Sequence, residues 1–327
     1  MDLLTNSRDN LIAGSAAGAG ADPVAVFRTP GIANVVPHRK PARAEARGSV
    51  PSNGKWSSLS ASPPSPWHGR AVVLIVIIAG TLRFAALDQY PLPIHQDELS
   101  DTYDGYSVAS TGADRSGDRW PIIVRGMGPG DYHPGLYVYL AAITTGLAGF
   151  SVWSGRLPAA IAGMLTVLLV YAVARRTLGR RGALLALAFV AFSPVHILYS
   201  RQAHTGGCLP PLFIILVVYL LLRLFNGSNE KRTGPATWWW AIAAGLVVGL
   251  FTSAYGAARL SALLLAMLGA GLIVVQFGLR QRDWRRMAIT LGLFASAVTV
   301  GALPQLYAMV AQPEEYFARA SNVLLPF

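Results

Sequence analysis

The sequence has a single cysteine, Cys208, and charged residues make up only 13% of its 327 residues. One cysteine excludes an internal disulfide and a cysteine-based zinc cluster. So low a share of charge is unusual for a soluble domain. Together with a hydrophobic share of 53% and a mean hydropathy of +0.43, it is typical of a protein that crosses the membrane several times.

The sequence also lacks a Walker motif, a Gly-rich phosphate loop and a nucleotide-binding βαβ pattern. The net charge of +11 alone would suit a nucleic-acid partner. However, the basic residues flank apolar runs instead of forming one stripe, so we expect no nucleic acid to bind.

Residues 1–68 differ from the rest of the chain. They are rich in Ala, Gly, Ser, Pro and Arg and have no sustained apolar period. The ordered n-region, apolar core and cleavage site of a signal peptide do not occur there. We predict a disordered arm over 1–68, which leaves residues 69–327 as the membrane domain.

Seven apolar runs are long enough to cross about 30 Å of hydrocarbon. They are residues 70–87, 156–174, 182–199, 209–225, 238–255, 260–278 and 287–308. The run 134–150 is shorter and holds three aromatic residues and three glycines. The fold class predicted from these runs is an all-α integral membrane bundle of about seven transmembrane helices.

The distribution of arginine and lysine assigns the run 134–150 to the membrane surface. If it is an interfacial helix and not a span, 19 of the 27 basic residues fall on the cytoplasmic side. Counting it as a span would move three basic loops, beginning with "RRTLGRR", to the wrong side. We therefore predict a cytoplasmic N-terminus and an external C-terminus.

Half of the 16 acidic residues lie between residues 88 and 131. In this topology they belong to a first external loop, residues 88–155, and a loop of that length is usually functional. We expect it to contain a helix over 97–110, a polar turn at "GADRSGDRWP" and the interfacial helix 134–150.

On the expected helix, Asp97, Asp101 and Asp104 have the spacing i, i+4, i+7 and share one face, with Glu98 beside it. Three interpretations remain open from the pattern. The face is a solvated surface, a site for a hard cation such as Mg²⁺, or the place of a carboxylate whose pKa is raised near lipid so that it serves as a general base.

Five stretches, in order, resemble a known family: "LRFAALDQYPLPIHQDELSDTYDGYSVASTG", "DYHPGLYVYLAAITTGLAGFSVWSGRLPAAIAG", "SPVHILYSRQA", "FTSAYGAARL" and "QPEEYFARASNVLLPF". They are similar to bacterial membrane glycosyltransferases of glycosyltransferase family 39, the protein O-mannosyltransferase-like group with the GT-C fold, related to the lipid A aminoarabinose transferases. The resemblance covers about residues 70–327. Members usually continue with more spans, so we expect the chain to correspond to the N-terminal catalytic part.

The resemblance implies a glycosyltransferase of the hexosyl or mannosyl type in the cell membrane, acting at its external face. The donor would be a sugar on a polyprenyl phosphate, and the acceptor a hydroxyl of a protein, lipid or glycan. The family's base, the Asp of an Asp-Glu pair, falls on Asp97, with Glu98 holding the pocket or orienting the acceptor. No cofactor and no catalytic metal are expected.

An anionic donor needs cations or hydrogen-bond donors beside it. Arg201 and Arg259 come at external ends of spans and are the candidates for phosphate contact. Further candidate substrate-binding residues are Asp101, His133, His204 and Tyr255. His133 stands where relatives carry a basic residue before two prolines, the second of which is Gly135 here.

Two other functions are compatible with a membrane bundle. A transporter or lipid flippase usually places charges at the bilayer midplane, often in paired repeats. The apolar runs here are almost free of acids and no internal repeat is visible. A non-catalytic, truncated partner of a glycosylation complex is the third function, and it would tolerate the loss of Asp97.

Overall fold

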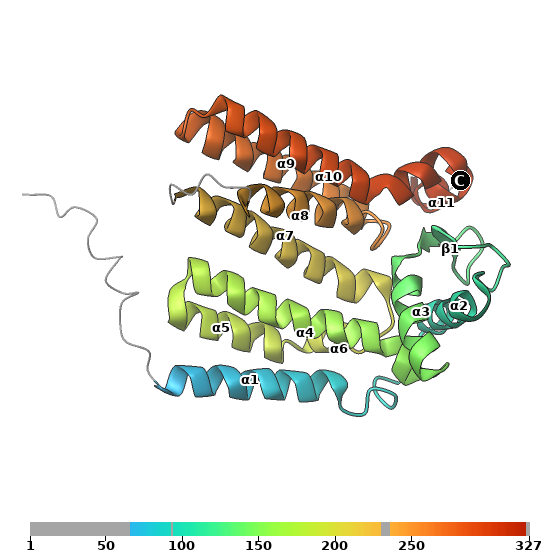
Figure 1. The fold of residues 1–327 in the computed structure, drawn as a ribbon. Coiled ribbons are helices and arrows are strands. Elements are labelled where there is room, and N and C mark those ends of the chain that lie inside the picture. The colour runs from blue at the N-terminus through green and yellow to red at the C-terminus, as the bar shows by residue number, and fades with distance from the viewer. Residues whose placement is uncertain (1–65, 93, 230–235, 325–327) are drawn as a thin grey trace, which may run out of the picture. The chain divides into compact units, whose positions relative to one another are not determined.

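The computed structural model describes residues 66–92, 94–229 and 236–324, and Figure 1 shows long helices side by side with shorter elements at one end. The predicted all-α membrane bundle is confirmed. The predicted arm over 1–68 lies outside the described residues except for 66–68, which begin the first helix.

The elements occur in an order that alternates long helices with short connections. They are α1 (Pro66–Phe84), α2 (Gln96–Thr111), β1 (Ile123–Arg125), β2 (Tyr132–Pro134), α3 (Leu136–Ala148), α4 (Val152–Thr177), α5 (Gly179–Phe192), α6 (Pro194–Tyr199), α7 (Thr205–Asn229), α8 (Ala236–Phe251), α9 (Ala258–Ile273), the π-helix η2 (Val274–Arg280), α10 (Trp284–Ala311) and α11 (Pro313–Leu324).

Five helical segments among the described residues are long and apolar enough to cross a membrane. They are Trp67–Phe84, Val152–Thr177, Gly206–Phe225, Ala258–Arg280 and Trp284–Ala311. The chain is thus a multi-pass membrane protein. The predicted spans 182–199 and 238–255 also form helices, but α5 and α8 have only 14 and 16 residues.

The predicted span 182–199 is interrupted at Pro194, which begins α6. Proline has no N–H, so the Val190 carbonyl of α5 loses the donor it would have in a continuous helix. Arg83 of α1 replaces that donor, with Nη2 3.1 Å from Val190 O and Nη1 3.2 Å from Ala191 O. A buried arginine therefore stabilises the end of a short helix inside the bundle.

Helices α8 and α10 are in backbone contact. A Cβ atom placed on Gly249 would lie 2.2 Å from the carbonyl oxygen of Val298, which no real side chain permits. Small residues of this kind allow close helix packing in membranes, where burial from water does not drive association. The two helices enclose a cluster of buried apolar side chains with α7, α9 and η2.

The segment predicted to be the first external loop, residues 88–155, forms the short elements at one end of the bundle, which we call the capped end (Figure 1). Helix α2 confirms the predicted helix 97–110, and α3 confirms the helix expected within 134–150. A two-stranded antiparallel hairpin, β1 with β2, pairs Val124 with His133 and was not predicted. At Gly155 a Cβ atom would lie 2.1 Å from Thr102 Oγ1, so only glycine allows α2 to approach α4 this closely.

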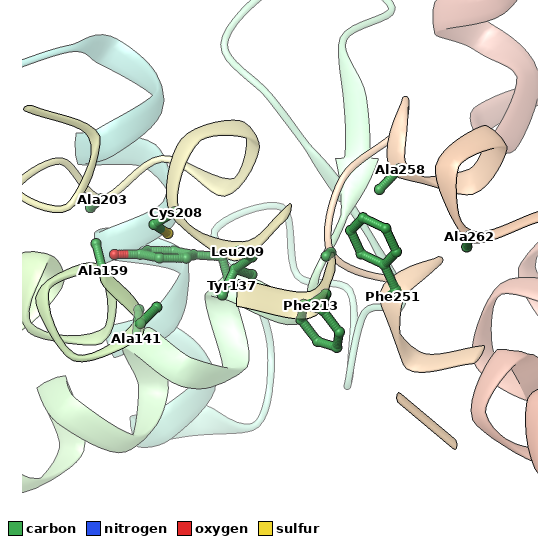
Figure 2. Packing of buried hydrophobic residues seen from close by; sticks show 12 residues of the cluster. Tyr137, Ala141, Ala159, Ala203, Cys208, Leu209, Phe213, Phe251, Ala258 and Ala262 are labelled. Carbon is green, nitrogen blue, oxygen red and sulfur yellow. The ribbon is translucent and has the colours of Figure 1, made fainter. Parts of the chain in front are cut away.

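An apolar cluster lies beneath the capped end (Figure 2). Phe213 and Phe251 are stacked, with ring centroids 5.3 Å apart. The buried Tyr137 of α3 donates its hydroxyl to the carbonyl of Gly155 at 2.8 Å. Ala203 and Ala258 belong to the same cluster. They directly precede His204 and Arg259, so this packing fixes the backbone from which those two side chains extend.

Candidate functional site

The buried ion pair of Glu98 and Arg156 attaches α2 to α4. The guanidinium donates to both carboxylate oxygens, Nε to Oε1 at 2.5 Å and Nη2 to Oε2 at 3.0 Å. The Ala203 N–H donates to Oε1 as well. Arg156 also donates to the carbonyls of Leu87 and Pro91. Because its oxygens are occupied and buried, Glu98 orients the helix and is poorly placed to accept a proton from substrate.

Asp101 lies one turn further along α2 and binds the hairpin. His133 of β2 places Nε2 2.8 Å from Asp101 Oδ1, and both side chains are buried. Burial lowers the pKa of His133, but the hydrogen bond and charge of Asp101 outweigh it, so that this pKa is raised. The predicted direct contacts of Asp101 and His133 with substrate are not supported, because the two side chains bind each other.

Asp104, in the next turn, binds Arg115 in the predicted polar turn. The Arg115 backbone N–H and Nη1 each lie 3.0 Å from a carboxylate oxygen. The guanidinium also donates to Ser100 and to the carbonyls of Arg125 and Gly126. Burial raises the pKa of Asp104 to about 6, against the lowering effect of Arg115.

The raised pKa of Asp104 predicts a pH-dependent stability. Its ordinary value is 3.8, so the folded protein holds this proton more tightly than the unfolded chain. Below about pH 4, Asp104 is protonated in both states and its contribution to the free energy of unfolding is complete. As pH rises through 6 the folded protein loses this proton, and the free energy of unfolding falls by up to about 3 kcal/mol. Relative to Asp104→Asn, the unfolding temperature of the wild type should fall between pH 4.5 and 8. A constant offset between the two proteins over this range would contradict the assignment.

Asp97 is the remaining acid of α2 and has a different environment. Its side chain is 29% exposed. Among the described residues its carboxylate has one ionisable partner within ion-pair distance, with Oδ2 3.5 Å from His95 Nδ1. That nitrogen already accepts the Asp97 backbone N–H at the helix N-cap, at 3.3 Å. Nδ1 therefore carries no proton to donate to the carboxylate, and Asp97 stays available to a ligand.

A row of rings continues from His95 away from α2. The ring centroids of His95 and His204 are 6.4 Å apart, and those of His204 and Tyr255 are 6.5 Å apart. Burial lowers the pKa of His204, although the charges of Asp97 and Asp101 act in the opposite direction. The second effect shows that the charges of these two acids act on His204. The structure thus connects three of the candidate site residues, Asp97, His204 and Tyr255, through the ring of His95.

Arg259 follows Tyr255 by four residues and lies in the first turn of α9. Its Nη1 donates to the carbonyl of Tyr316 and its Nη2 to Gln305 Oε1, both at 3.0 Å. Its guanidinium carbon lies 3.6 Å from the centre of the Tyr316 ring. Its Nε is buried without a partner among the described residues. Arg259 is therefore held in place on both sides, and its Nε–H stays unpaired in the part of the chain that the structure describes.

The structure does not support the prediction that Arg201 contacts phosphate. Its guanidinium donates five hydrogen bonds to backbone carbonyls at the C-terminal end of α1 and just beyond it. The acceptors are Leu82, Ala85, Ala86 and Tyr90. Carbonyls at a helix end lack internal partners and attract cations. Arg201 therefore caps α1, and its contact with phosphate stays a prediction.

The cation site considered for Asp97, Asp101 and Asp104 does not occur. Asp101 and Asp104 have separate cationic partners. In the described part of the chain, no three His, Cys, Asp or Glu side chains gather closely enough to hold a metal ion. In the polar turn, Asp114 Oδ1 instead accepts the backbone N–H groups of Ser116 and Asp118.

Three residues of the site were missed by the sequence interpretation in these roles. Arg156, Arg115 and Gln305 were not singled out as candidates. Arg156 carried a usable signal, since a cation at the start of an apolar span needs an acidic or carbonyl partner. Gln305 carried none that a single sequence would show.

Comparison with known proteins identifies the family. The model of the dolichyl-phosphate-mannose-protein mannosyltransferase family matches residues 132–306, more than half of the chain. The chain belongs to this family. No curated protein and no solved structure matches it.

The segment that matches the mannosyltransferase family contains only some of the candidate site residues. His133, Arg156, His204 and Arg259 lie inside the matched segment. Asp97 precedes it, so the role of that residue rests on the geometry described above. The family implies a membrane glycosyltransferase with a lipid-phosphate-linked sugar donor.

Proposed function

We propose that this chain transfers a sugar from a polyprenyl phosphate to an acceptor hydroxyl at the external face of the membrane, with inversion and with Asp97 as general base. The observation that carries the proposal is the contrast among the four acids of α2. Glu98, Asp101 and Asp104 are buried and each faces a cationic side chain. Asp97 alone is partly exposed, beside the row of His95, His204 and Tyr255.

The reaction requires a base and an anion-binding group on opposite sides of one carbon atom. The acceptor oxygen attacks the anomeric carbon while its proton passes to the Asp97 carboxylate. The bond between that carbon and the phosphate oxygen breaks, and the polyprenyl phosphate leaves with the electron pair. A single displacement of this kind inverts the configuration. A positioned carboxylate contributes about a hundredfold or more to such a rate.

The remaining charged groups divide these tasks. Arg259 offers its unpaired Nε to the leaving phosphate, and charge-assisted hydrogen bonds are the strong ones. His204 and Tyr255 continue the row of rings that begins at His95 beside the base, and they would contact the sugar. Glu98 is a positioning residue. Its ion pair with Arg156 holds the first turn of α2, which carries Asp97.

The basic connections of the bundle fit this orientation. The connection from α4 to α5 and the one from η2 to α10 lie opposite the capped end (Figure 1). Arg282 lies in the second of these connections, and Arg175, Arg176 and Arg285 lie in the helix turns next to them. The positive-inside rule places such loops in the cytoplasm, which puts the capped end outside.

A donor comparison tests the proposed function. Purified protein in lipid vesicles should transfer labelled sugar from a polyprenyl-phosphate sugar and not from the matching nucleotide sugar. Transfer should persist in EDTA. Equal use of both donors would contradict a lipid-linked donor. Movement of the lipid across the bilayer without any transfer or donor hydrolysis would favour a flippase.

A further inference from the structure

Gln305 of α10 is a buried amide with half of its hydrogen bonding unused. The side chain is 2% exposed. Its Oε1 accepts from Arg259 Nη2 at 3.0 Å, while Nε2 has no partner among the described residues. A buried polar group without a partner is rare and costly, so such a group in a folded protein needs an explanation.

The orientation of this amide is fixed by its neighbour. A guanidinium group only donates hydrogen bonds, so the amide atom that faces Arg259 must be the oxygen. The NH₂ group therefore points away from Arg259. Rotating the amide by 180° would set two donors against each other and cannot provide Nε2 with a partner.

Two unpaired donors consequently lie next to each other at the capped end. They are Nε2 of Gln305 and Nε of Arg259, both buried and both without a partner in the described ranges. The Arg259 guanidinium is packed against the Tyr316 ring and bonded to the Tyr316 carbonyl, so it is immobile. A fixed cation and a neighbouring amide, each with an unpaired donor, suit an oxyanion.

We propose that Gln305 is a phosphate-binding residue, which rests on the proposed function. Its Oε1 positions Arg259, and its Nε2 donates to an oxygen of the phosphate that leaves with the polyprenyl chain. The amide of Gln305 and the guanidinium of Arg259 thus bind the terminal phosphate of a lipid together. They recognise an oxygen of the phosphomonoester and not the sugar.

Binding of polyprenyl phosphate to the full chain in nanodiscs tests the proposal without requiring turnover. Gln305→Glu is the main variant, because it keeps an oxygen for Arg259 but replaces the NH₂ donor with a negatively charged acceptor. We expect Gln305→Glu to weaken binding at least about tenfold. Polyprenol without phosphate should bind the wild type and the variant equally weakly.

Thr290→Val is the matched control variant. Thr290 lies on the same helix, is fully buried and also has a hydroxyl without a partner among the described residues. It is about 22 Å from Gln305 along the helix axis, so its removal should leave the affinity unchanged. If Gln305→Glu does not fold, Gln305→Met also removes the donor and should weaken binding similarly.

The outcomes separate this inference from the proposed function. Equal affinity of the wild type and Gln305→Glu for polyprenyl phosphate would overturn the inference, even if sugar transfer is observed. Weakened binding by the variant would support it, even if the wild type transfers no sugar. If millimolar inorganic phosphate binds as tightly as polyprenyl phosphate, the site takes free phosphate and the lipid assignment is wrong.

Discussion

Replacement of Asp97 by Asn is expected to lower the rate of sugar transfer at least about a hundredfold. The carboxamide has the same shape and can still accept a hydrogen bond from the acceptor hydroxyl, but it cannot take the proton. The side chain is partly exposed and lies outside the buried ion pairs of α2, so the fold should be unaffected. The rate is measured with labelled donor and purified protein in lipid.

Asp88→Asn provides the control for this loss of activity. Asp88 is an exposed acid in the same external loop, and its removal changes the loop's charge by the same amount. It should leave the rate within about twofold of the wild type. If Asp97→Asn and Asp88→Asn were equally active, Asp97 would not be the base, and a non-catalytic partner role for the chain would gain support.

Replacement of Arg156 by Met should destabilise the protein by about 3–5 kcal/mol. The variant leaves the Glu98 carboxylate buried with only the Ala203 N–H as partner, and it removes the donor from the carbonyls of Leu87 and Pro91. The unpaired buried charge accounts for most of the stability that is lost when such a pair is broken. Thermal unfolding in detergent, followed by circular dichroism, measures the effect.

Two further variants show whether the pair itself is responsible. Arg119→Met removes an exposed arginine from the same loop and should change stability by less than about 0.5 kcal/mol. The double variant Glu98→Met, Arg156→Met removes both charges and should be more stable than Arg156→Met alone. If the double variant is less stable than Arg156→Met, the loss of stability in Arg156→Met comes from packing and not from the unpaired Glu98 carboxylate.

The positions of the membrane helices could be predicted from the sequence because lipid restricts the backbone so strongly. Every N–H and C=O group in hydrocarbon needs an internal partner, so a long apolar run has to be helical. The break at Pro194 was harder to predict. Pro158 and Pro304 lie inside continuous helices of the same bundle, so a proline alone does not reveal where a helix ends.

The acids of the site could be predicted from the sequence, but not their partners. The spacing of Asp97, Asp101 and Asp104 follows from the helical period alone. Their environments depend on tertiary contacts, such as that of Glu98 with Arg156, 58 residues away. The capping role of Arg201 was missed for the same reason, because its acceptors belong to a segment more than 110 residues earlier in the chain.

The three pairs that bind α2 to its surroundings also constrain how this sequence can change in evolution. Each pair joins an acid of one helix to a cationic side chain from a different segment, α4, β2 or the polar turn. Loss of either member alone leaves a buried charged or polar group without its partner. Substitutions in one segment should therefore survive only with a compensating change in the other, so positions 98 and 156, and likewise 101 and 133, are expected to covary among homologues.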